Sequence, residues 1–260
     1  MKLLTPLITA IAGFSLSLAY AGSGQISVTS SEFRIPVVEL YTSEGCSSCP
    51  QADNWLRQLG ESLDQDFNAV PLAFHVDYWN YLGWADPFSK PAFTARQREV
   101  ARNNRQRNIY TPEFLVDGRE ARGGTGIVEA IQRANSQSAV VTIALSLMRS
   151  GLNSINAVLD VNNRSNLGDA YAYAAIYESG ISRQIGAGEN HGKILKHDFV
   201  VRHWSEPITI QLGDNNASIN LEIPSDWSRS NLGLAVVVLD HVHGGTLQAV
   251  STPLGSLFAS

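Results

Sequence analysis

The two cysteines of the chain, Cys46 and Cys49, are separated only by Ser47 and Ser48. Two cysteines are too few for a disulfide-rich scaffold, and a bridge that closes so short a loop adds little chain-entropy stabilisation. A Cys-x-x-Cys pair at a turn from a strand into a helix places its first sulfur near unpaired backbone amides, which favour a thiolate. We therefore expect thiol–disulfide exchange, with Cys46 as the nucleophile and Cys49 as the thiol that resolves a mixed disulfide.

Other interpretations of the pair stay open. A structural zinc site needs four ligands, and the sequence contains no second Cys-x-x-Cys that would supply them. The pair can also form an inert bridge that only pins the turn. His241 and His243, two residues apart on a predicted strand, would point to one face as in a copper or zinc site. Scattered surface histidines are the simpler interpretation of the same residues.

The elements that would position the cysteines alternate between strand and helix. The expected elements are a strand over 35–41, a helix after the cysteines through Leu59, a strand over 69–76, a helix over 94–108, a strand over 113–116 and a helix over 127–134. This alternation predicts an α/β domain over residues 22–137.

The pattern changes after residue 137 to short alternating runs without a long helix. The expected strands cover 141–147, 154–161, 170–177, 208–212, 217–223, 234–239 and 246–250. Strands at this spacing, separated by turn signals, predict an all-β domain over residues 138–260. The expected architecture is an immunoglobulin-like sandwich.

The compartment is indicated by residues 1–21, which read as a secretory signal with Ala19-Tyr20-Ala21 as its cleavage site. No other stretch approaches the ~18 apolar residues of a membrane span, so we expect an exported, periplasmic or secreted protein.

The composition is that of a folded chain. The chain has 260 residues, of which 44% are hydrophobic and 17% charged, which excludes a disordered chain. A net charge of -5 gives no basic field for nucleic acid.

Several other side chains are candidates for a role near the cysteines. The aromatic segment 78–84 is either a loop that caps the core or an apolar wall that receives an extended client, with Trp79 and Trp84 as its main members. Asp77 is a candidate for proton transfer, although a turn or capping role is the simpler interpretation. Five arginines on the predicted helix over 94–108 are most simply a solvated face.

The order of these elements resembles the thioredoxin superfamily: a strand, Cys46-Ser47-Ser48-Cys49, helix, strand, helix, Thr111-Pro112, strand and helix. The resemblance implies a cis-proline at Pro112 that faces the cysteines, and a peptide-contacting backbone at Thr111. Segments 39–50, 75–79 and 83–88 together are similar to a bacterial family of secreted thioredoxin-like proteins catalogued as a domain of unknown function.

The sequence departs from the common thioredoxin pattern at two places. Gly45 stands where an aromatic residue usually precedes the first cysteine, and the dipeptide between the cysteines is Ser-Ser. These positions tune the reduction potential, so oxidation, reduction and isomerisation of clients stay as alternatives.

Together these features predict a candidate thiol–disulfide oxidoreductase without a cofactor or a bound metal. Its partners would be proteins that carry thiols or disulfides. The catalytic residues would be Cys46, Cys49 and Pro112, and the client-binding residues would be Thr111, Trp79 and Trp84. The alternatives are a non-catalytic thioredoxin-fold binding module with a structural disulfide, and a copper-binding chaperone that uses both thiolates and a late histidine.

Overall fold

The computed structural model describes residues 24–63, 68–242 and 244–259. The signal segment expected over 1–21 lies outside the described residues. The helices are α1 (Cys49–Ser62), α2 (Pro91–Asn103), α3 (Gly123–Asn135) and α4 (Gly255–Phe258), with 3₁₀ turns η1 (Asn80–Leu82) and η2 (Arg229–Asn231). The strands are β1 (Gln25–Thr29), β2 (Val37–Thr42), β3 (Val70–His75), β4 (Glu113–Val116), β5 (Arg119–Glu120), β6 (Val141–Arg149), β7 (Ser154–Asn163), β8 (Ala170–Glu178), β9 (Ile181–Gln184), β10 (Ile194–His197), β11 (Val200–Trp204), β12 (Ile208–Ile210), β13 (Gly213–Glu222), β14 (Leu232–Asp240) and β15 (Thr246–Pro253). No helix among the described residues combines the length and apolar character needed to cross a bilayer.

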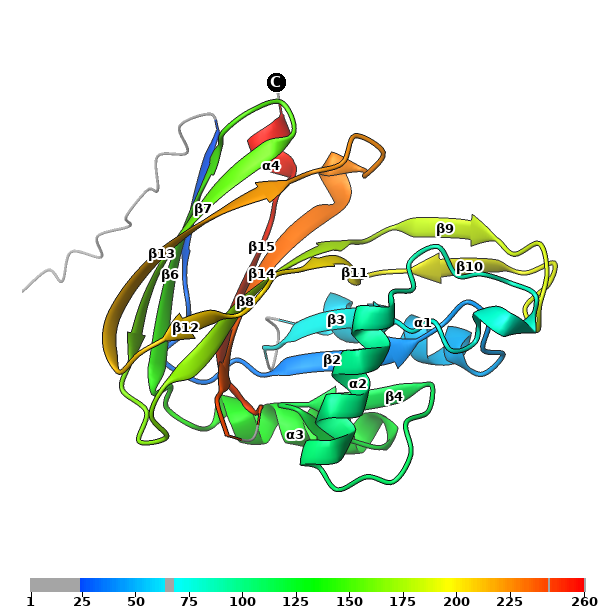
Figure 1. The fold of residues 1–260 in the computed structure, drawn as a ribbon, viewed down its shortest axis with the longest axis horizontal. Helices are drawn as coiled ribbons and strands as arrows, with labels where there is room; N and C mark the ends of the chain where they lie inside the picture. The colour runs from blue at the N-terminus through cyan, green and yellow to red at the C-terminus, as the bar shows by residue number, and fades with distance from the viewer. Residues whose placement is uncertain (1–23, 64–67, 243, 260) are drawn as a thin grey trace, which may run out of the picture.

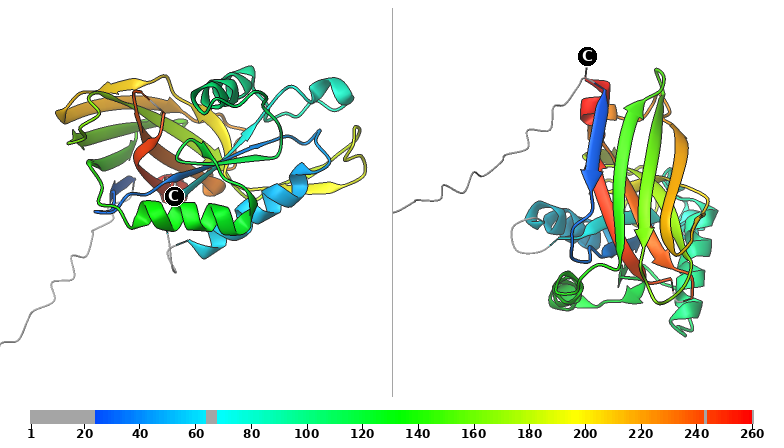
Figure 2. Two further views of the ribbon diagram at one scale, coloured as in Figure 1. Left: turned by 90° about the horizontal axis from the view of Figure 1, so that it is seen from below. Right: turned by 90° about the vertical axis from the view of Figure 1, so that its left-hand side faces the viewer.

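Helices cover both faces of the sheet in the first half of the chain. Strands β2 and β3 run parallel, β4 runs antiparallel to β2, and every residue of β2 and β3 is buried. Helices α1 and α3 pack on one face through Leu56, Ile127 and Ile131, while α2 covers the other face with Phe93 and Val100. Figure 2 shows this division of the helices between the two faces. The continuous apolar runs of β2 and β3 therefore reflect burial on both sides.

Two sheets pack face to face in the second half. A four-stranded antiparallel sheet has the order β1-β6-β7-β13, and its inner face meets β8, β14 and β15 of the larger sheet. Strands β6 and β7 alternate between buried and partly exposed residues, so that Ile143, Leu145 and Leu159 point into the core beside Val236. This period of two is the signal that predicts the strands.

A single nine-stranded sheet crosses the expected boundary between residues 137 and 138. Its order is β15-β14-β8-β11-β3-β2-β4-β5, with β12 paired to β8. Strand β11 joins the two halves, because it pairs antiparallel with β8 and parallel with β3. In the smaller sheet, β1 from the first half pairs with β6 from the second. The two halves are therefore connected by strand pairing in both sheets.

A long hairpin extends from the second half toward the start of α1. Strands β9 and β10 form their own two-stranded sheet, and they reach beyond the edge of the sandwich (Figure 1). The sequence predicts a hairpin within 191–199, whereas the structure begins it ten residues earlier, at Ile181. Strands β1, β9 and β11 are not predicted by the sequence pattern.

Helix α2 differs from its prediction in length and in the role of one arginine. It ends at Asn103 instead of residue 108, and Arg105 after it has a left-handed φ of 57°. Arg96 is not part of a solvated face. It makes two contacts with the buried carboxylate of Glu39, at 2.6 and 3.2 Å, and lies 4.5 Å from the ring centre of Trp204.

Candidate functional site

The two cysteines form a disulfide in the turn between β2 and α1. Their Cα atoms are 5.4 Å apart, and Cys46 retains 2% exposure while Cys49 retains none. The helix begins at Cys49, so Cys46 lies in the preceding turn, where its carbonyl accepts a hydrogen bond from the Cys49 amide at 3.3 Å. Pro50 falls in the first turn of the helix, where its missing N–H breaks no hydrogen bond.

Trp79, Thr111 and Gly45 lie together beside the first cysteine. A Cβ at Gly45 would lie 3.1 Å from the Cβ of Trp79 and 3.4 Å from its backbone oxygen, so a larger residue before Cys46 would crowd Trp79. The indole Nε1 donates a 2.7 Å hydrogen bond to the hydroxyl of Thr111, and the peptide bond from Thr111 to Pro112 is cis. The aromatic segment therefore links the cysteine turn to the Thr-Pro turn.

Trp84 lies under the hairpin and against the cysteine turn. Its Nε1 donates to Oε2 of Glu44 at 2.7 Å. At the hairpin tip, a Cβ on Gly186 or Gly188 would lie 3.1 or 3.0 Å from Trp84. The indole N–H of Trp84 is thus hydrogen-bonded to Glu44, and the hairpin tip packs against its side chain.

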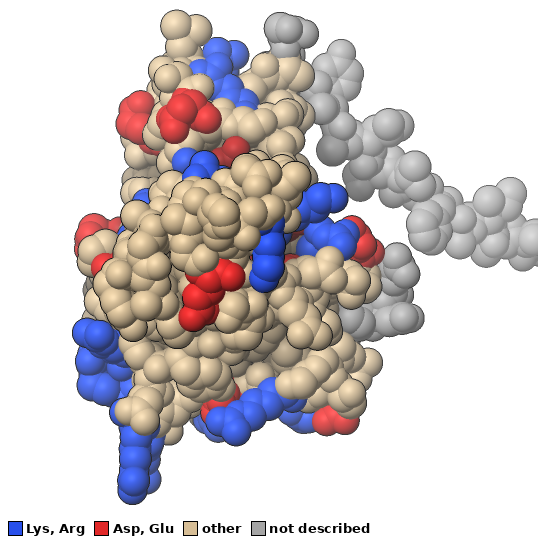
Figure 3. Space-filling view, turned by 90° about the vertical axis from the view of Figure 1, so that its right-hand side faces the viewer, with Lys and Arg blue, Asp and Glu red and all other residues tan. Residues whose placement is uncertain are grey.

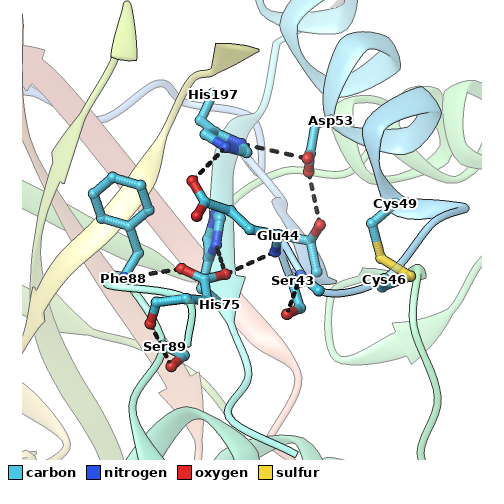
Figure 4. Close-up of polar contacts among 12 residues, drawn as sticks. Ser43, Glu44, Cys46, Cys49, Asp53, His75, Phe88, Ser89 and His197 are labelled. Carbon is cyan, nitrogen blue, oxygen red and sulfur yellow. Dashed lines mark hydrogen bonds and ion pairs between the residues drawn. A yellow bond between two sulfur atoms is a disulfide. The ribbon is translucent and has the colours of Figure 1, made fainter. Parts of the chain in front are cut away.

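A buried cluster of ionisable side chains lies to one side of the disulfide (Figure 4). His197 at the end of β10 is between two carboxylates: its Nε2 lies 3.3 Å from Oε1 of Glu44, and its Nδ1 lies 3.4 Å from Oδ2 of Asp53. Asp53 also accepts a 2.8 Å hydrogen bond from the hydroxyl of Thr42, and Arg183 of β9 lies 3.2 Å from Glu44. Glu44 and His197 are at most 1% exposed.

A second buried pair continues this cluster on the other side of Glu44. His75 Nδ1 lies 2.7 Å from Oδ2 of Asp86, and the same carboxylate accepts hydrogen bonds from the backbone amides of Glu44 and Phe88. The rings of His75 and His197 meet edge to face with centres 5.1 Å apart. The end of β3, the aromatic loop and the hairpin therefore all converge beside the cysteine turn.

The electrostatics of the cluster favour the charged forms of His197 and Asp86. Burial lowers the pKa of His197, but interaction with Asp53 and Glu44 outweighs it and raises the pKa to about 9. Burial raises the pKa of Asp86, but His75 and the backbone amides of Glu44 and Phe88 bring it below its usual value. A protonated imidazole therefore lies between two carboxylates at neutral pH.

The tip of the hairpin also holds the backbone of the cysteine turn. Asn190, which is fully buried, donates hydrogen bonds from Nδ2 to the carbonyl oxygens of Glu44 and Cys46, each at 2.9 Å. Its Oδ1 accepts a bond from Lys193 Nζ at 2.9 Å. These contacts fix the tip on the loop that carries the disulfide.

The structure brings Cys46, Cys49, Trp79, Thr111 and Trp84 into one region, although Trp84 is engaged with Glu44. Pro112 follows Thr111 directly, at the start of β4. Sequence reasoning missed the members of the buried cluster. They are Glu44, Asp53, Asp86 and the two histidines, His75 and His197. The local signal for Glu44 is a charged residue between an apolar strand and the cysteines.

Two other candidates have different roles from those considered. Oδ1 of Asp77 accepts a 2.5 Å hydrogen bond from the hydroxyl of Thr94 in α2. His241 packs against the ring of Tyr171, and His243 lies outside the described residues. Over the described part of the chain, no three His, Cys, Asp or Glu side chains are arranged to hold a metal ion.

The fold and the site define a class: a mixed α/β protein of two large sheets, with a Cys-x-x-Cys disulfide beside a buried ionic cluster. The chain belongs to the family described as protein of unknown function (DUF1223), whose model matches residues 37–239. That match includes the cysteine turn, the aromatic loop and the hairpin. No protein in the curated set matches the chain.

Two solved structures share the fold over most of the chain. A structural genomics crystal structure of a protein from Agrobacterium tumefaciens is 25% identical, with a TM-score of 0.61, and covers 86% of this chain and 96% of that one. HBP35 of Porphyromonas gingivalis is 15% identical, with a TM-score of 0.66, and covers 86% of this chain and 76% of that one. The second likeness concerns the fold alone.

Proposed function

We propose that the protein is an exported thiol–disulfide exchange protein that acts on protein clients through Cys46 and Cys49. The single observation that carries the proposal is the disulfide at the start of α1, beside a buried ionic cluster (Figure 4). The proposed fold class is a thioredoxin-like α/β unit followed by an immunoglobulin-like sandwich. The parallel pair β2 and β3, the antiparallel β4 and the cis bond before Pro112 support this class.

The proposed exchange proceeds in two balanced steps. A client thiolate attacks the sulfur of Cys46, a new S–S bond forms, and Cys49 leaves as a thiolate that takes up one proton. A second client thiolate then attacks the client sulfur of this mixed disulfide, and Cys46 leaves as a thiolate. The client loses two electrons and becomes a disulfide, and the protein gains them as a dithiol. The reverse sequence reduces a client disulfide.

We assign the proton taken up by Cys49 to the pair of His197 and Asp53. Asp53 is four residues after Cys49 in α1, so both side chains lie on one face of the helix. In Figure 4, Asp53 lies between His197 and the disulfide. With its pKa raised to about 9, close to the ordinary value of a cysteine thiol, His197 carries a proton at neutral pH and can share it with the leaving thiolate of Cys49.

The surface around the site suits an extended, largely uncharged client segment. Figure 3 shows that the end of the molecule carrying the hairpin tip presents few charged side chains near its centre. Tyr81 of η1, two residues after Trp79, is 79% exposed. Aromatic side chains of this kind bind apolar segments with little loss of conformational entropy.

The test is the oxidative refolding of a reduced, unfolded protein that needs disulfides for its activity. We expect wild type to accelerate refolding and Cys46→Ser to have no effect above background. With a client that already carries a disulfide, Cys46 of Cys49→Ser should attack it, release one client thiol and remain as a trapped mixed disulfide. Ser47→Ala serves as the matched control that keeps both sulfurs. Equal rates for wild type and Cys46→Ser would contradict the proposal.

A second candidate function is a binding module with a permanent bridge. The nearly complete burial of both cysteines favours it, because an exchanging sulfur must be reached by a client. The reduction potential separates the two functions. A potential below about -300 mV is typical of structural disulfides and would support the module.

A further inference from the structure

The carboxylate of Glu189 holds the backbone immediately after Cys46. Its Oε2 accepts a 3.0 Å hydrogen bond from the amide of Ser47, although the two residues are 142 positions apart in the chain. Glu189 itself is exposed, but it directly precedes Asn190, which is fully buried and bonded to the carbonyls of Glu44 and Cys46. The backbone of Glu189 is therefore held in place by a buried neighbour.

This amide belongs to the peptide bond that follows Cys46, two residues before the first residue of α1. Unpaired backbone amides close to a cysteine sulfur favour its thiolate, and Glu189 occupies this one. The hydrogen bond from Ser47 lowers the pKa of Glu189, so the side chain is ionised at neutral pH. The carboxylate of Glu189 thus takes the amide that would favour a negative charge on the Cys46 sulfur, and it places its own negative charge there.

We propose that Glu189 is a positioning residue through which the β9–β10 hairpin sets the reactivity of Cys46. Its carboxylate takes the Ser47 amide and places negative charge beside the sulfur, so the Cys46 thiolate is disfavoured and the disulfide is favoured. The inference rests on the proposed function, because in that function Cys46 leaves as a thiolate when a client is oxidised and attacks as a thiolate when a client is reduced.

The remaining charged groups near the cysteine turn lie in the cluster beside the disulfide or at the hairpin tip. They are Glu44 of the turn, Asp53 of α1, His75 of β3, Asp86 of the aromatic loop, and Arg183, Lys193 and His197 of the hairpin. Their partners are one another, Asn190, or groups of the surrounding core. Glu189 differs from them because its partner is the amide next to Cys46.

The size of the effect follows from covalent geometry. The sulfur of Cys46 is within about 5 Å of the Ser47 nitrogen, and therefore within about 8 Å of the carboxylate oxygen. At a water-like dielectric constant, removing this charge should lower the pKa of Cys46 by about half a unit. Below its pKa, the fraction of thiolate would then rise about threefold.

The experiment measures the pKa of Cys46 in the reduced mature protein. The rate of iodoacetamide alkylation is followed against pH at low ionic strength, and mass spectrometry separates the peptide of Cys46 from that of Cys49. Glu189→Gln removes the charge and keeps an acceptor for the amide, whereas Glu189→Ala removes both. Glu129→Gln makes the same change of net charge on the exposed face of α3 and serves as the control.

We expect Glu189→Gln to lower the pKa of Cys46 by about half a unit, Glu189→Ala to lower it at least as far, and high salt to shrink both shifts. An unchanged pKa in Glu189→Gln, or an equal shift in Glu129→Gln, overturns the inference. The alkylation assay contains no client. If the pKa falls but wild type shows no exchange, the inference stands and the proposed function fails.

Discussion

The protonated imidazole of His197 between two buried carboxylates makes a specific prediction for the dependence of stability on pH. Its pKa is about 9 in the folded protein, against an ordinary value of 6.5 for histidine. Because folding raises the pKa, the stabilisation is full below about pH 6.5 and is lost as pH rises through about 9. The difference, 9 - 6.5 = 2.5 units, corresponds to about 3 kcal/mol.

The perturbation is His197→Gln, which keeps a polar side chain but removes the titrating cation from Glu44 and Asp53. Urea unfolding of the oxidised protein, followed by tryptophan fluorescence, gives the free energy of unfolding between about pH 6 and about pH 10. We expect wild type to be more stable at the acidic end by about 3 kcal/mol, and this excess to disappear at the alkaline end. Subtracting the free energy of unfolding of His197→Gln from that of wild type at each pH cancels the contribution of the other titrating groups.

The matched control is His191→Gln, because His191 is exposed at the hairpin tip. Its stability should follow that of wild type throughout the pH range. Stability curves of wild type and His197→Gln that stay parallel from acid to alkali would refute the assignment of a buried imidazolium to this site.

Two further predictions concern packing around the site. Arg96→Ala leaves the buried Glu39 carboxylate without its cation, so the free energy of unfolding in urea should fall by about 3–5 kcal/mol. Replacing Arg102, which is exposed on the same helix, should change that free energy by less than about 0.5 kcal/mol. Equal effects of the two changes would contradict the buried pair. A Cβ at Gly60 would lie 2.3 Å from Cζ of Phe199, so Gly60→Ala should cost about 1–3 kcal/mol. Adding Phe199→Ala should relieve that clash, and a double variant whose loss equals the sum of the single losses would argue against the contact.

The local pattern of apolar and polar residues was sufficient to predict the strands whose burial is either periodic or continuous. Strands β2 and β3 are apolar throughout because helices cover both faces, and β6 and β7 alternate because one face meets the core. Strand β9 escaped detection because none of its four residues, Ile181 to Gln184, is fully buried and three of them are polar. Its position is set by pairing with β10, which sequence spacing does not reveal.

The cysteine turn could be predicted because its residues are adjacent in the sequence. The buried cluster could not, because Glu44, His75, Asp86 and His197 come from four segments that meet only after the hairpin folds back. Arg96 illustrates the same limit. In a helix rich in arginine its periodicity resembles a solvated face, and its partner lies 57 residues earlier on another element.

The pairing of β1 with β6 and of β3 with β11 has a consequence for the order in which the chain can fold. The chain is synthesised from its N-terminus, so β1 can pair only after residues 141–149 have been made. The outer edge of β3 can be covered only after residues 200–204 have been made. Such long sequence separations are characteristic of slow folding, because chain entropy is lost before the contacts form. Until then both strands expose unsatisfied edges, so the nascent chain depends on protection from aggregation for most of its synthesis.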